Sequence, residues 1–123
     1  MWTYEQSTGR LSRNGIDAAT GYSGHEDGLN NPAMQDVRMV GPAPRGTYTI
    51  GPAQLHPHLG PITMELIPDA GNEMFGRSEL FIHGDNQQMN HTASDGCLIF
   101  NRETRAAIAV AGLNGDTTLE ITE

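Results

Sequence analysis

The segments Glu79-Leu80-Phe81-Ile82-His83 and Gly96-Cys97-Leu98-Ile99-Phe100 are two short apolar runs that indicate the fold class of this chain. Each has the length of a β-strand and contains the β-branched and aromatic residues that favour one, and Gly84-Asp85-Asn86 supplies a turn after the first. Similar runs predict further strands at residues 2–6, 9–13, 34–40, 47–51, 63–67 and 117–122. The pattern therefore predicts a mainly β domain built from short strands.

One segment late in the chain has a helical period instead. Apolar residues recur at helical spacing over residues 102–113, and Asn101 before them is a suitable N-cap. We therefore predict one short helix in the C-terminal region. Residues 15–32, in contrast, are polar and rich in glycine, and we expect them to form a long surface loop.

The composition limits both the organisation of the chain and its functions. A length of 123 residues suits a single domain over residues 1–123, and a single cysteine excludes an internal disulfide. All seven basic residues are arginine, against 15 acidic residues, so the net charge is −8. The lack of lysine excludes a Schiff base and a P-loop lysine, and the acidic charge argues against nucleic-acid binding.

The distribution of apolar residues also bears on location. No run approaches the length of a membrane span, so we expect no membrane insertion. The residues that follow Met1 contain neither a basic start nor an apolar stretch. We therefore expect a protein made in the cytoplasm without a cleavable signal peptide.

The most informative candidate for chemistry is the pair His83 and Cys97. His83 ends one predicted strand, and Cys97 lies 14 residues later in the next. Adjacent strands would bring an imidazole and a thiol together, and a cysteine nucleophile needs such a base near neutral pH. Gly96 lets the backbone turn so that the amides of Gly96 and Cys97 can face an oxyanion.

The same residues allow other interpretations. Cys97 could be a buried core residue, as free cysteines often are, in a non-catalytic module that binds the cell wall or a partner. The pair could also serve a cysteine peptidase or amidase that acts on another bond. A zinc site from His83, His91, Asp85 and Cys97 fits no standard ligand spacing, so we predict no metal site.

Five ordered motifs extend the pattern over most of the chain, from about Trp2 to Val110. They are Tyr22-Ser23-Gly24, Asn30-Asn31-Pro32-Ala33-Met34-Gln35, Gly41-Pro42-Ala43-Pro44-Arg45-Gly46-Thr47-Tyr48, Phe81-Ile82-His83-Gly84 and Ser94-Asp95-Gly96-Cys97-Leu98-Ile99. This arrangement resembles the L,D-transpeptidase (YkuD-like) family and is most similar to its small branch of type VI secretion L,D-transpeptidase effectors. The resemblance implies a β-sandwich or barrel and requires no cofactor.

The resemblance also implies roles for individual residues. Cys97 would be the nucleophile and His83 the general base. Ser94 and Gly96 would shape the segment of residues 94–97, here called the cysteine loop. The substrate-binding residues would be Tyr22, Ser23, Gly84, Asp95, Arg45 and Arg102. Two positions depart from the typical pattern, because Asp95 stands where histidine is usual and Ile99 where asparagine or arginine is usual. Either Arg45 or Arg102 could replace that missing cation, since arginine binds a carboxylate well.

The implied substrate is the peptidoglycan stem peptide. The enzyme would cleave the L,D bond to the terminal D-alanine through a thioester, giving L,D-carboxypeptidase or D-amino-acid exchange activity. The resemblance further implies an antibacterial effector that acts in the periplasm of a target bacterium, with a secretion-machinery carrier and an immunity protein that blocks the cleft. We expect the remaining histidines, His25, His56, His58 and His91, to be solvated surface residues. The alternatives are that His56 and His58 line one wall of the cleft and that His91 is a second catalytic histidine or a gate.

Overall fold

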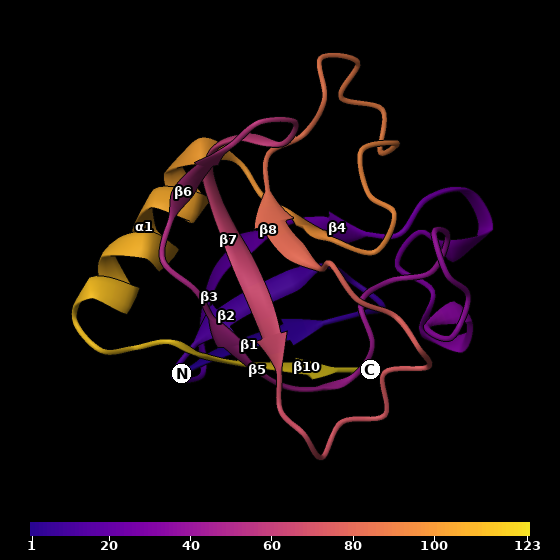
Figure 1. Ribbon diagram of the computed structural model, residues 1–123, viewed down its shortest axis with the longest axis horizontal. Helices are drawn as coiled ribbons and strands as arrows, with labels where there is room; N and C mark the ends of the chain where they lie inside the picture. The colour runs from indigo at the N-terminus through magenta and orange to yellow at the C-terminus, as the bar shows by residue number, and fades with distance from the viewer.

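The computed structural model describes residues 1–123 and shows a mainly β protein with one α-helix (Figure 1). The strands are β1 (Trp2–Glu5), β2 (Arg10–Arg13), β3 (Ile16–Thr20), β4 (Tyr22–Ser23), β5 (Gly46–Ile50), β6 (Gln54–His56), β7 (Gly60–Pro68), β8 (Phe81–His83), β9 (Leu98–Ile99) and β10 (Thr118–Thr122). The helix is α1 (Arg102–Leu113), and two short 3-10 helices are η1 (Glu26–Gly28) and η2 (Pro32–Met34). The predicted fold class is therefore confirmed.

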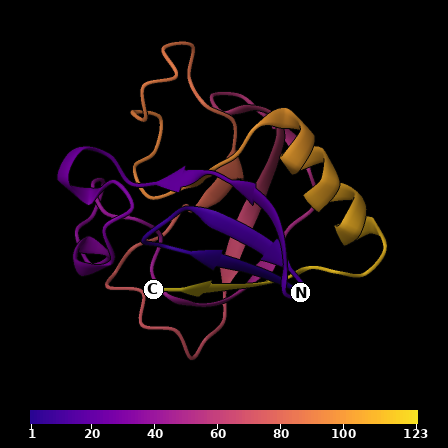
Figure 2. The ribbon, with the colours of Figure 1, turned by 180° about the vertical axis from the view of Figure 1, so that it is seen from behind.

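The strands form one sheet that curls into a nearly closed barrel. Their order is β3-β2-β1-β10-β5-β7-β8-β9-β4, with β6 paired to β7 outside this path. The pairs β1–β10 and β8–β9 are parallel, and the other pairs are antiparallel. Strands β3 and β4 form the two edges of this sheet, yet they are consecutive in the chain (Figures 1 and 2). The chain therefore passes directly from one edge of the sheet to the other.

Gly21 is the residue that joins these two edges. Its amide donates a hydrogen bond of 2.8 Å to the carbonyl of Gly9. A Cβ atom on Gly9 would lie 1.9 Å from the Gly21 carbonyl oxygen, and one on Gly21 would lie 2.0 Å from the carbonyl oxygen of Ile99. Both positions therefore require glycine, because the backbones approach each other too closely for any side chain.

The inner faces of the strands form one hydrophobic core. Its largest fully buried side chains include Tyr4, Tyr48, Met64, Ile82 and Leu98. The helix α1 covers one side of the barrel next to β6 and β7 and adds Ile108 and Ala111 to this core (Figure 1).

The helix begins and ends where the sequence predicts. The side chain of Asn101 accepts a hydrogen bond of 2.8 Å from the amide of Thr104, which satisfies one of the free donors of the first turn. Glu103 lies in the same turn, where a negative charge is favourable. The predicted helix over residues 102–113 is therefore confirmed.

Two sequence predictions about these segments need correction, and one strand was missed. Residues 34–40 are not a strand, because Asn31 caps the 3-10 helix η2 and the amide of Val37 bonds to the carbonyl of Met34 in a following turn. Residues 15–32 are not one loop, because they contain the strands β3 and β4. Strand β3 is mostly exposed, so its sequence lacks the apolar alternation that predicts a strand. The short strand β6 was also not predicted.

Two buried tyrosines give a matched test of this core. The hydroxyl of Tyr48 donates a hydrogen bond of 2.7 Å to the carbonyl of Pro44, whereas the buried hydroxyl of Tyr4 has no partner. We expect Tyr48→Phe to lower the free energy of unfolding by about 1 kcal/mol and Tyr4→Phe to leave it unchanged or raise it. Urea unfolding of both variants measures the difference. An equal loss in the two variants would contradict the unpaired state of the Tyr4 hydroxyl.

Candidate active site

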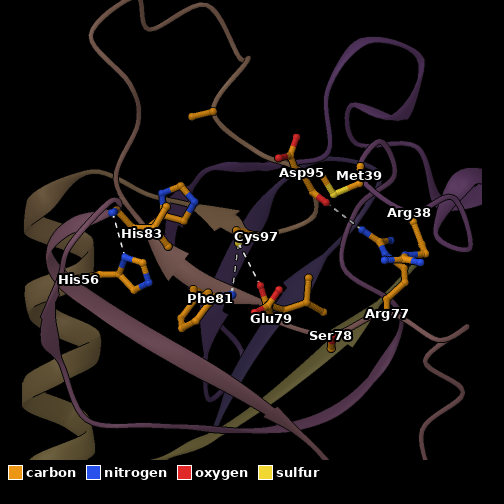
Figure 3. Close-up of a pocket in the computed structure, with 13 residues that line it drawn as sticks. Arg38, Met39, His56, Arg77, Ser78, Glu79, Phe81, His83, Asp95 and Cys97 are labelled. Carbon is orange, nitrogen blue, oxygen red and sulfur yellow. Dashed lines mark hydrogen bonds between the residues drawn. The ribbon is translucent and has the colours of Figure 1, made fainter.

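A pocket of about 370 Å³ opens at the edge of the barrel beside β8 (Figure 3). Both residues of the predicted pair, Cys97 and His83, line it. The other lining residues are Arg38, Met39, His56, Leu59, Arg77, Ser78, Glu79, Leu80, Phe81, Ala93 and Asp95. In Figure 3, His83 and His56 lie on one side of Cys97, and Arg77 and Arg38 lie on the other.

The register between β8 and β9 explains how the pair reaches this pocket. These strands are parallel neighbours, with Ile82 opposite Leu98. Both of these side chains are buried in the core. Side chains alternate along a strand, so Phe81, His83 and Cys97 face the opposite side, toward the pocket. His83 ends β8 and Cys97 immediately precedes β9, so the prediction that two adjacent strands bring the imidazole and the thiol together in one place is confirmed.

The hydroxyl of Ser94 holds the loop that precedes Cys97. It accepts hydrogen bonds from the amides of Gly24 at 2.9 Å and Gly96 at 3.1 Å, and it donates one of 2.6 Å to the carbonyl of Cys97. Ser94 is fully buried. Its contacts are those of a residue that positions the cysteine loop, as the sequence predicts for it.

Ser23 makes a second buried link to the same loop. Its hydroxyl donates to the carbonyl of Gly96 at 3.0 Å and accepts from the amide of Ala43 at 2.9 Å. Ser23 is fully buried and does not line the pocket. The resemblance implies a substrate contact for Ser23, but its hydroxyl is used here between two backbone segments.

The guanidinium of Arg77 packs beneath the cysteine loop. Its nitrogens donate to the carbonyls of Gln35, Pro42, Gly41 and Asp95 at distances between 2.6 and 3.1 Å. Gly96 packs directly on it, and a Cβ there would lie 2.2 Å from Nη2 of Arg77. Gly96 also has a φ of +130°, so both space and backbone conformation require glycine.

These contacts change the expected oxyanion donors. The amide of Gly96 is directed at the Ser94 hydroxyl and is not available to a substrate. The amide of Cys97 has no hydrogen-bond partner within the chain. Of the two predicted donors, only the amide of Cys97 is therefore free to bind an oxyanion.

The thiol of Cys97 is protonated in the resting protein. Burial raises its pKa to about 11, and the nearby charge of Asp95 adds to this effect. The hydrogen bond of 3.4 Å from the Phe81 amide to Sγ and the charge of Arg77 act in the opposite direction but are weaker. A base is thus needed to generate the thiolate at neutral pH.

The imidazole of His83 is neutral and lines the same pocket as Cys97. Burial lowers its pKa below the ordinary value, and the charge of Arg105 acts in the same direction. Its Nδ1 lies 2.8 Å from the carbonyl of Gly84, which can only accept, so Nδ1 carries the proton and Nε2 is free. Arg105 is held in turn by the carbonyls of Phe100 and Pro61.

Gly84 provides space for this arrangement. A Cβ on Gly84 would lie 2.8 Å from Nη2 of Arg105. Gly84 does not line the pocket, although the sequence predicts it to bind substrate. Glycine is therefore needed at position 84 because a side chain there would collide with the guanidinium of Arg105, next to His83.

Tyr22 closes the base of the loop that rises above the pocket. Its hydroxyl donates to Asp85 at 2.6 Å and accepts from the amide of Ala93 at 3.2 Å. The ring also packs edge-on against His91, with centroids 4.8 Å apart. Tyr22 is buried behind this loop and does not line the pocket, and its hydroxyl joins Asp85 to Ala93 at the two ends of residues 85–93.

The arginines that the sequence suggests for a substrate carboxylate lie elsewhere. Arg45 donates to Gln6 at 3.2 Å and lies 3.8 Å from Glu123. Arg102 is exposed in the first turn of α1. Neither residue lines the pocket, whereas Asp95 does. Arg38 and Arg77 supply the cations there, and the sequence analysis missed both.

Two histidines expected at the surface also belong to the site. His25 donates from Nδ1 to the carbonyl of Ser94 at 2.8 Å and lies 3.5 Å from the carboxylate of Asp95. His56 lines the pocket and packs against Phe81 with ring centroids 5.4 Å apart. Each stands in a polar or proline-rich stretch that carries no periodic signal, so spacing in the sequence could not place it.

The structure also bears on metals and membranes. No three of the histidine, cysteine, aspartate and glutamate side chains are arranged to hold a metal ion. None of the helices is long and apolar enough to cross a membrane.

Comparison with known proteins assigns the chain to a family. The Tlde1 domain matches residues 17–123, which include every residue of the pocket. No curated protein matches the chain. The family match confirms the predicted relation to type VI secretion effectors. Because it covers most of the sequence, the chain belongs to the Tlde1 domain family of type VI secretion effectors.

Proposed function

We propose that this chain is a cysteine enzyme that removes the terminal D-alanine from peptidoglycan stem tetrapeptides by cleaving the L,D bond. The observation that carries the proposal is the pair of Cys97 and a neutral His83 in one pocket. Membership of the Tlde1 domain family supports an activity related to peptidoglycan.

The first half of the reaction would form a thioester. Nε2 of His83 takes the proton from Cys97 as Sγ attacks the carbonyl carbon of the third stem residue. The carbonyl oxygen becomes an oxyanion next to the free amide of Cys97. When the tetrahedral intermediate collapses, His83 returns the proton to the departing amine, so D-alanine leaves as a neutral amine.

The acceptor decides the product of the second half. Water activated by His83 would hydrolyse the thioester to a tripeptide, which is L,D-carboxypeptidase activity. A D-amino acid would give an exchanged tetrapeptide instead. The tripeptide lacks the L,D bond that a donor stem needs for L,D cross-linking, whereas the exchanged tetrapeptide keeps such a bond but ends in a different residue. Loss of donor stems by hydrolysis would suit an antibacterial effector.

The raised pKa of the Cys97 thiol favours a mechanism in which proton transfer to His83 and attack by the sulfur occur together. With a pKa of about 11, roughly one Cys97 in ten thousand is ionised at pH 7. A preformed thiolate–imidazolium pair would need the opposite shifts at both residues. The proton therefore moves to His83 during attack, when the substrate is already bound.

The family supports proposals about delivery and partners. Type VI secretion effectors usually have an immunity partner, and we propose one that covers the pocket around Cys97 and His83. We also propose delivery by a secretion-machinery carrier into the periplasm of a target bacterium, where stem peptides are accessible.

Muropeptide turnover tests the reaction directly. We expect the wild-type protein to remove one D-alanine from a tetrapeptide muropeptide and Cys97→Ala to remove none. His83→Asn should lower the rate by about 10²-fold or more, because general-base catalysis is lost. Mass spectrometry with and without an added D-amino acid separates tripeptide from exchange products.

The matched control for that experiment is His58→Asn. His58 is exposed and does not line the pocket, so its replacement should leave the rate unchanged. Intact tetrapeptide with the wild-type protein would overturn the proposed reaction. Release of a different fragment would instead identify a cysteine peptidase or amidase that acts on another bond.

Alkylation of Cys97 without substrate tests its protonation state. We expect the rate with iodoacetamide to rise about tenfold per pH unit and to level off near pH 11, because only the thiolate reacts. Asp95→Asn should increase the rate at a fixed pH, since removing the negative charge lowers the pKa of the thiol. Asp69→Asn makes the same charge change outside the pocket and should have no effect. A plateau below pH 9 would contradict a protonated resting thiol.

A further inference from the structure

Arg38 differs from the other arginines in lining the pocket with no partner inside the protein. Arg77 and Arg105 are buried and donate to backbone carbonyls. Arg10, Arg13 and Arg45 each have an acidic neighbour, which is Asp17, Asp116 and Glu123 respectively. Arg102 is also without a partner but lies outside the pocket. The guanidinium of Arg38 is therefore exposed, charged and available to a ligand.

The backbone that carries Arg38 is tied to the cysteine loop. The amide of Gly41 bonds to the carbonyl of Val37 at 3.0 Å, which closes a turn around Arg38. The carbonyl of Gly41 then accepts from Arg77, whose other contacts include the carbonyl of Asp95 at 3.1 Å. One buried guanidinium therefore connects the turn of Arg38 with the residue two positions before Cys97.

A second link holds the same turn. The carbonyl of Val40 accepts a hydrogen bond of 3.0 Å from the amide of His25, and the His25 ring bonds to the carbonyl of Ser94. The turn is thus attached to the cysteine loop through both Arg77 and His25. These contacts give the backbone of Arg38 a defined place relative to Cys97, from which its side chain enters the pocket.

The charges around Arg38 indicate which kind of anion would bind. Arg77 adds a second positive charge to the same side of the pocket, opposite His83 and His56 (Figure 3). Glu79 and Asp95 also line the pocket and would repel a highly charged ligand. A single carboxylate, which a guanidinium can bind through two parallel hydrogen bonds, suits this balance better than a phosphate.

We propose that Arg38 binds the free α-carboxylate of the residue that leaves, and so selects peptides whose scissile bond is the last one. This inference rests on the proposed function, because it names the group by which the same pocket recognises its substrate. A carboxylate at Arg38 would direct the last peptide carbonyl toward Cys97. A stem with an additional residue, or one whose end is joined to another group, would lose this contact.

Paired substrates test this inference. We would compare release of the terminal residue from a tetrapeptide acid and from the same peptide with a C-terminal carboxamide. The wild-type protein should prefer the acid in kcat/KM by about 10- to 100-fold, the range expected for a charged hydrogen-bonded contact. Arg38→Gln should lose most of that preference, because its kcat/KM should fall for the acid and stay the same for the carboxamide. Arg38→Lys should keep part of the preference.

The control variant is Arg10→Gln, which removes the same charge from β2 outside the pocket and should retain the full preference. The side chain of Arg38 is exposed and has no hydrogen bond or ion pair within the protein, so thermal unfolding of Arg38→Gln should match the wild type. Equal rates for acid and carboxamide with the wild-type protein would overturn the proposal. An unchanged preference in Arg38→Gln would also overturn it.

Binding to the Cys97→Ala variant separates this inference from the proposed reaction. Calorimetry with the two tetrapeptides should show tighter binding of the acid, and Arg38→Gln in the same background should remove the difference. If the wild-type protein cleaves neither peptide while this difference is present, the reaction is wrong and the role of Arg38 is supported. If Cys97→Ala binds both peptides equally, the role of Arg38 is wrong.

Discussion

The buried guanidinium of Arg77 is the contact on which the arrangement of the pocket depends. A charge removed from water must be compensated, and here four backbone carbonyls provide the hydrogen bonds while no carboxylate forms an ion pair with Arg77. Those carbonyls belong to the segment 35–42 and to the cysteine loop, which are far apart in the sequence. The need to satisfy one cation therefore draws two segments together and leaves no room for a side chain at position 96.

The chemistry of the site follows from burial. Burial raises the pKa of the Cys97 thiol and lowers the pKa of the His83 imidazole, so the resting pair is neutral. The hydrogen bond from Nδ1 to the Gly84 carbonyl leaves Nε2 of His83 free to accept a proton. A protonated thiol reacts slowly, so the proposed reaction would begin only when a bound substrate brings a carbonyl to the sulfur.

Much of the fold could be predicted because its core strands and helix carry periodic signals. The alternation in residues 47–51 and 117–122 and the helical spacing after Asn101 match elements of the structure closely. The prediction failed in segments whose side chains are exposed or whose backbone is turned by a preceding element. Strand β3 is an exposed edge strand without alternation, and residues 34–40 carry strand-forming residues but are turned by the capped 3-10 helix before them. Closure of the barrel at Gly21 depends on contacts with Gly9 and Ile99 that no local pattern reveals.

By itself, the sequence determined the mainly β class, the position of the helix, and the identity of the thiol and the imidazole. These features are local, since they depend on residue type and on spacing along one stretch of chain. Only the tertiary structure decided which other side chains join Cys97 and His83. It directed Ser23, Tyr22 and Gly84 into the supporting framework and brought Arg38, Arg77, His25 and His56 to the site. The physical reason is that hydrogen bonds between distant backbone segments, and the burial of one guanidinium among them, have no signature in linear spacing.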